Sequence, residues 1–365
     1  MNLSKQHGRF CSYEQLSSHL LWGESHQSGD VRQEVCEDER SQAQMSGVDM
    51  ADGSTGPAQV VLTASIARRY YLEGRSKIEI AEEFGLNRFK VARLLDQARE
   101  SGLVRIEIRH QGGIDVDLSA RLQERFGLQH SVVVDTPDDD VESLREHLGR
   151  AAAQLLAELV TPQDVLGLAW ARAVSAMARA LPRLPGTPVV QLTGALSLPG
   201  GPDTSVDVVR DVAAASGGTA FCFYAPLTVQ DAATARALRQ QPEVARAFGQ
   251  LPFVTKAVAG VGLWEPGQST VYDTVSDEER DALRELGVCA DISGVFVSAD
   301  GEPVPTELAQ RMITVTADEM RAIPEVIVIP YGTRKAPAVR AALRSGLVGG
   351  IVTHTTLARA VLDEA

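Results

Sequence analysis

The sequence is short of cysteine and of long apolar runs, and each shortage narrows the class of protein. Its four cysteines, Cys11, Cys36, Cys222 and Cys289, are widely separated, form no C-x-x-C pair and have no histidine at ligand spacing. This argues against disulfides and structural zinc. There is no apolar run long enough to span a membrane, and no basic start leads into an apolar core. We therefore expect a cytoplasmic protein with no membrane partner and no metal site.

Positive charge is also scarce, but it is unevenly distributed. The chain has 35 Lys and Arg against 48 Asp and Glu, a net charge of −13, which by itself argues against nucleic-acid binding. Residues 66–110, however, carry ten basic and seven acidic side chains, net +3, whereas residues 1–57 carry four and nine, net −5. A basic segment in an acidic protein confines phosphate contacts to that segment.

The length of 365 residues and the 44% hydrophobic content allow two folded domains. Residues 1–57 are polar and are expected to be disordered; alternatively, the segment is a mistaken upstream start, since Met45 and Met50 precede the first periodic helix. A DNA-binding domain is expected over 58–110. After a hinge at 111–113, an effector-binding and oligomerisation domain is expected over 114–365.

Residues 76–100 predict two short helices joined by a tight turn. Ser76 followed by Glu79 forms a capping box that begins the first helix. Gly85 follows the apolar end of this helix and suits the left-handed conformation that ends helices. Asn87 then caps the second helix. This arrangement is typical of a helix-turn-helix, although the same spacing also occurs in unrelated helical pairs.

The second helix has a buried stripe and an open face. Val91, Leu94, Leu95 and Ala98 recur at helical spacing. The open face presents an aromatic ring, cations and an amide, groups that pair with base edges in the major groove. An ordinary solvated face is the alternative. The predicted DNA-binding residues are Ser76, Lys77, Asn87, Arg88, Phe89, Lys90, Arg93 and Gln97. Residues 62–74 predict a bracing helix, and 104–110 a strand-like wing, so we expect a winged helix-turn-helix.

Beyond residue 113, short apolar strands alternate with helices. This pattern predicts an α/β domain with a largely parallel sheet covered on both faces. The expected strands are 131–135, 164–170, 188–194, 219–226, 256–263, 311–316, 325–330 and 349–353, with a hairpin at 294–304.

Four loops that follow expected strands share small residues, hydroxyls or cations at a helix start: 170–172, 191–194, 331–335 and 353–356. Such loops converge at the carboxyl edge of a parallel sheet, where exposed N–H groups and helix dipoles favour negative charge. Each loop taken alone is equally consistent with ordinary caps and turns. Together they predict a phosphate or carboxylate site.

These segments resemble the SorC family of sugar-responsive bacterial transcriptional regulators, sometimes grouped with deoxyribonucleoside regulators. The resemblance runs from about residue 60 to the end. It rests on the order of segments such as KIEIAEEFGLNRFKVARLLDQARESGLVRIEI, VVQLTG, DISGVFVSADG, IPEVIVIPYGTRKAPAVRAALRSGLV and IVTHTTLARAVL. It implies a homotetramer, a C-terminal domain related to sugar-phosphate isomerases, and a phosphorylated sugar as effector.

Carried over by position, the resemblance implies effector contacts around Trp170 to Ala173 and at Gln191, Thr193, Asp291 and Lys335. Together with the strand-end loops, the predicted effector residues are Trp170, Arg172, Gln191, Thr193, Gly194, Asp291, Gly332, Thr333, Lys335, Thr353 and His354. Lys335 is the expected phosphate partner. Two departures stand out. Ala169-Trp170-Ala171 followed by Arg172 replaces the family's Ser-Trp-Gly, and Thr353-His354 replaces Thr-Asp. They suggest a more acidic ligand than a simple sugar phosphate, or a lost ligand.

Two further points stay open at the sequence level. His354 is equally read as a helix-capping surface residue. Asn87 and Ala92 replace serines common in the family, so the family's operator sequence does not carry over to this chain.

Two functions compete on this evidence. The first is a DNA-binding regulator of a carbohydrate-related operon, gated by an anionic effector. The second is a sugar-phosphate isomerase or deaminase-like enzyme, with Asp203, Asp207, Asp291 and His354 as candidate bases. None of these four lies in a hydrolase elbow, a metal-ligand spacing or a phosphate loop, and Gly260-Val261-Gly262 lacks the third glycine of a dinucleotide fingerprint. We expect no catalytic residue and no cofactor.

Overall fold

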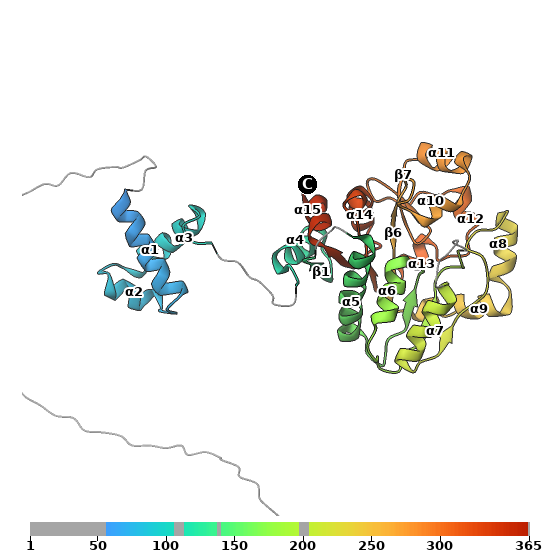
Figure 1. Ribbon diagram of the computed structural model, residues 1–365, viewed down its shortest axis with the longest axis horizontal. Helices are drawn as coiled ribbons and strands as arrows, with labels where there is room; N and C mark the ends of the chain where they lie inside the picture. Colours follow the sequence, from blue (N-terminus) through green and yellow to red (C-terminus); the bar gives the residue numbers. More distant parts are fainter. Residues whose placement is uncertain (1–55, 106–112, 137–139, 197–203, 364–365) are drawn as a thin grey trace, which may run out of the picture. The chain divides into compact units, whose positions relative to one another are not determined.

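The computed structural model describes residues 56–105, 113–136, 140–196 and 204–363 (Figure 1). The chain divides into two compact units, residues 1–104 and 105–365. The expectations for residues 1–55, for most of the wing segment and for Asp203 lie outside the described residues.

From residue 56 on, unit 1 contains three helices, α1 (Pro57–Tyr71), α2 (Lys77–Glu83) and α3 (Arg88–Glu100). Their start and stop signals act as the sequence predicts. Ser76 and Glu79 form the capping box, the Asn87 side chain accepts from the backbone N–H of Lys90, and Gly85 has a φ of 65°. The helices enclose one core, made of Ile66, Ala67, Ile80, Ala81, Val91, Leu94, Leu95 and Ala98.

Unit 2 is built on a seven-stranded, wholly parallel sheet in the order β1-β10-β9-β5-β2-β3-β4. The strands are β1 (His130–Val134), β2 (Leu166–Leu168), β3 (Val189–Gln191), β4 (Ala220–Phe221), β5 (Lys256–Ala259), β9 (Glu325–Val328) and β10 (Gly350–His354).

Helices cover both faces of this sheet. One apolar cluster joins it to α5 (Val141–Leu159), α6 (Arg172–Ala180) and α7 (Ser205–Ser216). The other joins it to α4 (Val116–Phe126), α14 (Ala336–Arg344) and α15 (Thr355–Leu362). Side chains alternate between the two clusters, as Val258 does with Ala257 and Ala259 on β5. The predicted α/β class with a largely parallel sheet is confirmed.

A smaller antiparallel sheet follows in the order β6-β7-β8, with β6 (Val261–Leu263), β7 (Val288–Ile292) and β8 (Val295–Ser298). The remaining helices are α8 (Ala232–Arg239), α9 (Pro242–Phe248), α10 (Thr270–Thr274), α11 (Asp277–Glu285), α12 (Glu307–Gln310), α13 (Ala317–Arg321), η1 (Leu251–Phe253) and η2 (Thr333–Lys335). None of the helices in the described part of the chain is long and apolar enough to cross a membrane.

Two strand expectations are wrong. The segment 256–263 is not one strand, because it breaks at Gly260 and its halves join different sheets. A Cβ on Gly260 would lie 2.7 Å from the Ala171 Cβ, so glycine permits this close passage. The segment 311–316 makes only single bridges, Met312 to Thr228 and Thr314 to Thr193. Its backbone groups are divided between two different loops, which prevents a continuous ladder.

The order of the strands creates a crevice at one edge of the large sheet. From β2 the chain passes to β3 and β4 on one side, whereas β5, β9 and β10 lie on the other. The connections after β2 and β5 therefore leave in opposite directions. Ligands of open parallel sheets bind outside the carboxyl ends of the strands at such a switch point.

Candidate functional site

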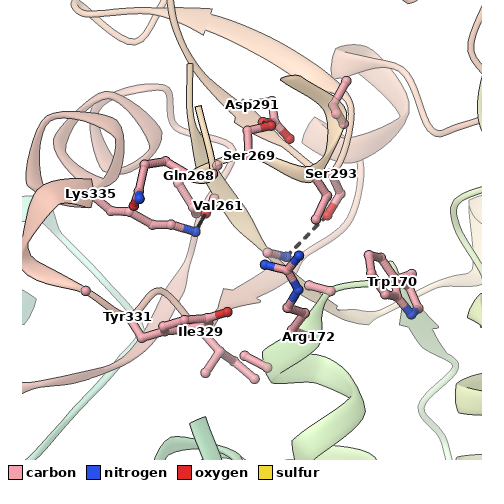
Figure 2. A pocket seen from close by; sticks show the side chains of 18 of the residues that line it. Trp170, Arg172, Val261, Gln268, Ser269, Asp291, Ser293, Ile329, Tyr331 and Lys335 are labelled. Carbon is pink, nitrogen blue, oxygen red and sulfur yellow. Dashed lines mark hydrogen bonds between the residues drawn. The ribbon is translucent and has the colours of Figure 1, made fainter. Parts of the chain in front are cut away.

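A cavity of about 390 Å³ opens at this switch point, at the carboxyl ends of β2, β3, β5 and β9. Figure 2 shows side chains that follow β2 and β9, and side chains of or near the small sheet, converging on it. Eight predicted effector residues line it: Trp170, Arg172, Thr193, Gly194, Asp291, Gly332, Thr333 and Lys335. These eight residues come from four separate segments of the chain.

Lys335 is a partly buried cation of the cavity. Its Nζ donates to the backbone oxygen of Val261 at 2.8 Å and lies 5.2 Å from the centre of the Tyr331 ring. Burial lowers the pKa of Lys335 to about 8; the charge of Arg172 adds to this effect and that of Asp291 opposes it. A partly buried ammonium with a depressed pKa is incompletely solvated, so an anionic ligand would stabilise it.

Asp291 is buried and its carboxylate accepts a hydrogen bond from Ser269 Oγ at 2.5 Å. Burial raises the pKa of Asp291, while the Ser269 hydrogen bond and the Lys335 charge act against that rise. The carboxylate lies directly against Gly262, where any Cβ would overlap it. Glycine at 262 is therefore needed to admit the Ser269–Asp291 pair.

Arg172 is the first residue of α6 and its guanidinium projects into the cavity (Figure 2). The first turn of α6 has no acidic side chain. Lys335 is the N-cap residue of α14, which again has no acidic residue in its first turn. Both helix starts therefore combine the positive end of a helix dipole with a cation, and both favour negative charge in the cavity.

Gln191, Thr353 and His354 do not line the cavity, and all three are fully buried. The Gln191 side chain bonds to the Thr193 carbonyl at 2.9 Å and accepts from the backbone N–H of Phe223 at 3.0 Å. Thr353 donates to the carbonyl of Pro330 at 3.1 Å. Their contacts hold the loops that do line the cavity, so any influence on a ligand passes through those loops.

His354 holds the 331–335 loop through its imidazole ring. Its Nε2 accepts from the backbone N–H of Gly332 at 3.1 Å, so the neutral ring carries its proton on Nδ1, 2.8 Å from Thr356 Oγ1. His354 does precede α15 at the N-cap position, but it is buried, so the alternative of a surface residue is wrong. Without a carboxylate at this position, the imidazole anchors the 331–335 loop.

We expect His354→Leu to loosen this loop, because the Gly332 N–H then loses its acceptor, at a cost of about 1–3 kcal/mol. A cost of that size raises the opening equilibrium of the loop, so amide hydrogen exchange in a peptide covering 331–335 should become roughly 5- to 150-fold faster. His354→Gln, which keeps a side-chain acceptor, is the matched control. Equal exchange in His354→Leu and the parent protein would show that the loop is held by other contacts.

Thr193 and Gly194 also serve the architecture of the site. Thr193 Oγ1 accepts from the backbone N–H of Trp170 at 3.1 Å, which ties the β2 and β3 loops together. A Cβ on Gly194 would lie 2.5 Å from the Pro226 carbonyl oxygen, so this loop requires glycine for packing. Gly194 therefore shapes the cavity with its backbone.

Sequence reasoning missed several lining residues, among them Arg145 of α5 and three residues that belong to or pack against the small sheet, Gly262, Ser269 and Ser293. Ser293 has a φ of 51°, accepts from the backbone N–H of Gly260 at 3.2 Å and lines the cavity. It directly precedes Gly294 in the motif DISGVFVSADG, which carried part of the family resemblance. A polar residue in a tight turn was the available signal.

The candidate bases of the enzyme hypothesis are dispersed. Asp207 caps α7, where its carboxylate accepts from the backbone N–H and the hydroxyl of Thr204. His354 accepts a hydrogen bond from the backbone N–H of Gly332 and does not itself line the cavity. Among the described candidates, Asp291 alone faces the cavity, in the hydrogen bond with Ser269.

In unit 1, all eight predicted DNA-binding residues are solvent-exposed. Ser76 and Asn87 use their side-chain oxygens to cap α2 and α3, which sets the geometry of the turn. Phe89 is 71% exposed although it lies in a capped, well-packed helix. Lys90 and Arg93 extend the same open side of α3, opposite the buried stripe.

Comparison with known sequences gives one family and several full-length relatives. Residues 113–363 match the model of the family described as "Putative sugar-binding domain". The transcriptional regulator LsrR of Klebsiella pneumoniae is 31% identical over 309 residues, covering 84% of this chain and 94% of that protein. The uncharacterized transcriptional regulator YjhU of Escherichia coli is 29% identical, covering 80% and 92%.

Solved structures share the fold. The full-length sorbitol operon regulator SorC of Klebsiella pneumoniae superposes with a TM-score of 0.64 at 24% identity, covering 84% of this chain and 99% of that one. A DeoR family transcriptional regulator from Listeria monocytogenes gives a TM-score of 0.61 at 27% identity, covering 67% and 98%. At 24% identity the likeness to the sorbitol regulator concerns the fold alone.

Proposed function

Because this chain belongs to the SorC-type family that carries the sugar-binding domain, we propose that it is a DNA-binding transcriptional regulator of a carbohydrate-related operon, gated by an anionic effector. The observation that carries the proposal is the pairing, in one chain, of an exposed recognition helix with a cation-lined cavity at a sheet switch point. A phosphorylated sugar is the proposed effector.

The charge of the cavity supports an anionic ligand. Arg145, Arg172, Arg334 and Lys335 line it together with one carboxylate, Asp291, whose pKa is raised by burial. We assign the phosphate to Lys335 and the adjoining start of α14, where a charge-assisted hydrogen bond and the helix dipole act together. Arg172 then faces the remainder of the ligand and favours an additional acidic group on the sugar.

Gating requires that the effector bind two states of the protein with different affinity. The family resemblance leads us to propose a homotetramer whose DNA-binding units are rearranged by effector binding. Sedimentation of the full chain with and without effector tests this assembly directly.

The proposal is tested in two steps on the full-length protein. Fragments of the source genome are first selected for binding and the operator is identified among them. Thermal-shift measurements then screen phosphorylated sugars, sugar acids and nucleosides; a ligand at a hundredfold excess over its Kd stabilises the folded state by about 2.7 kcal/mol. Specific DNA binding that changes with a hit supports the proposal, and failure to select any specific fragment contradicts it.

The enzyme alternative makes a different prediction for the same hits. Turnover of a bound sugar phosphate by the full chain, lost in Asp291→Asn, would favour it, since Asp291 is the described candidate base that faces the cavity. Stable binding without product is the outcome expected for an effector.

Effector affinity is expected to fall as the pH rises above about 8, the pKa of Lys335 in the ligand-free protein. The phosphate binds the protonated amine, and a phosphate monoester is already dianionic above about pH 6. Between pH 7 and pH 9 the Kd should therefore increase about tenfold, since roughly nine-tenths of the amine is then neutral. Isothermal titration across this range measures it; a constant Kd would remove Lys335 from the phosphate contact.

A further inference from the structure

Unit 1 leaves two large apolar side chains in solvent at the place where α2 and α3 begin. Ile78 is 56% exposed and Phe89 is 71% exposed, whereas the apolar residues of the neighbouring core are at most 6% exposed. Both are the second residue of their helix. With Ala92 they line a hollow between the two helix starts. Other exposed apolar residues of unit 1, such as Val61 and Leu72, lie outside this hollow.

Cations surround this apolar surface. Lys77 and Arg88 line the same hollow, and no acidic side chain is among its lining residues. The Arg88 guanidinium lies over the Phe89 ring, 4.7 Å from its centre, which limits the orientations open to the ring. Within the described residues, neither these two cations nor Lys90 and Arg93 on α3 form an ion pair.

The cations and the exposed Phe89 ring together suit double-stranded DNA that presents an apolar group to the ring. Unpaired cations flanking the hollow suit phosphate oxygens, and the N-terminal residues of a recognition helix meet the base edges. In the major groove, the apolar group on those edges is the 5-methyl of thymine. A protein partner for the same hollow would need acidic groups to match Lys77 and Arg88.

We propose that Phe89 reads the 5-methyl group of one thymine in the operator, with Ile78 closing the hollow beside it. This inference rests on the proposed function, because it requires specific DNA binding. The inference adds to the proposed function a specificity-determining contact that depends on a single methyl group. Phe89 thus supplies apolar readout on the same open side of α3 as the predicted DNA-binding residue Arg93.

The test uses the full chain and its selected operator. Each thymine is replaced in turn by deoxyuridine, which removes the methyl group and leaves base pairing intact. At one position the affinity of the parent protein should fall about fourfold, the value of one buried methyl group. Phe89→Ala should bind the thymine operator at least about fourfold more weakly and should no longer distinguish thymine from uracil.

Arg93→Ala is the matched control, because it should weaken binding to both operators and keep their ratio. Phe89 is largely exposed, so an unchanged thermal midpoint of Phe89→Ala verifies that its fold is intact. Specific binding that is insensitive to every thymine replacement overturns the inference and leaves the regulator proposal standing. Persisting sensitivity in Phe89→Ala also overturns it, since another residue then reads the methyl.

Two outcomes concern the partner itself. A change in the sedimentation of Phe89→Ala without DNA would place the ring in a contact between copies of the chain and would overturn methyl readout. Absence of any specific operator would contradict the proposed function and this inference together.

Discussion

Replacing Lys335 with methionine is expected to raise the free energy of unfolding of the ligand-free protein at pH 7 by up to about 3 kcal/mol. Burial lowers the pKa of Lys335 from 10.5 to about 8. Each tenfold change in the protonation equilibrium corresponds to about 1.4 kcal/mol, so keeping the ammonium charged in the folded state costs roughly that total. Methionine fills a similar volume without the charge.

The pH dependence gives the sign of this effect. The unfolded state holds the proton up to a higher pH than the folded state, so the stability of the parent protein rises between about pH 8 and 10.5. Below pH 8 the cost is fully present, and the advantage of Lys335→Met should shrink as the pH approaches 10.5. Urea unfolding monitored by tryptophan fluorescence measures it at both ends of the range.

Arg334→Met is the matched control. Arg334 lies in the same loop as Lys335, but its side chain is 70% exposed and pairs with Glu265. It should leave the pH profile unchanged. A Lys335→Met protein that is less stable than the parent at every pH would show that the attraction between Lys335 and Asp291, together with the hydrogen bond to Val261, outweighs the burial cost.

The same substitution should remove effector binding. Truncating one partner of a buried, hydrogen-bonded charge pair costs about 2–5 kcal/mol, so the Kd of a phosphorylated effector should increase roughly 30-fold or more. A more stable protein that no longer responds to effector is the signature of a residue kept for its ligand. Retained affinity would place the phosphate elsewhere in the cavity.

Arg93→Ala is expected to weaken operator binding by about 1–3 kcal/mol and to relax the base preference at one position. Arg93 is exposed on α3, on the same side as Phe89, and lies within the first two turns after the Asn87 cap. A guanidinium there can donate to O6 and N7 of guanine. Titration of the operator and of its single-base variants at a fixed salt concentration measures both effects.

Arg99→Ala provides the comparison within the same helix. Arg99 lies in the last turn of α3 and forms an ion pair with Asp96 at 2.5 Å. Its replacement by alanine therefore removes the same charge as Arg93→Ala, but away from the helix start. It should not change base preference. If Arg93→Ala and Arg99→Ala weaken binding equally and without loss of specificity, Arg93 contacts phosphate and does not read a base.

The elements that the sequence predicted well are those specified by neighbouring residues. The capping box of Ser76, the cap at Asn87, the left-handed Gly85 and the buried stripe of α3 all depend on contacts within a few residues. Such short-range rules hold whatever the rest of the chain does. The alternation of strands and helices in unit 2 was readable for the same reason.

The role of each strand-end residue depended on where its strand stops. Trp170, Thr193 and Lys335 lie beyond the ends of β2, β3 and β9 and line the cavity. Gln191, Thr353 and His354 are still within β3 and β10, so their side chains are buried in the layers of the fold. Strand ends cannot be located from sequence to within one or two residues, and that difference decides whether a side chain reaches the ligand.

By itself the sequence determined the helix-turn-helix, the parallel α/β class and the family, because local periodicity, caps and motif order carry that information. Only the tertiary structure decided that Gly260 separates two sheets, that Ser269 joins Asp291 in the cavity, and that His354 holds the 331–335 loop from behind. In each of the two hydrogen bonds, the partners are 22 residues apart along the chain. These contacts form because the order of the strands, which no local pattern specifies, brings those segments to the same edge of the sheet.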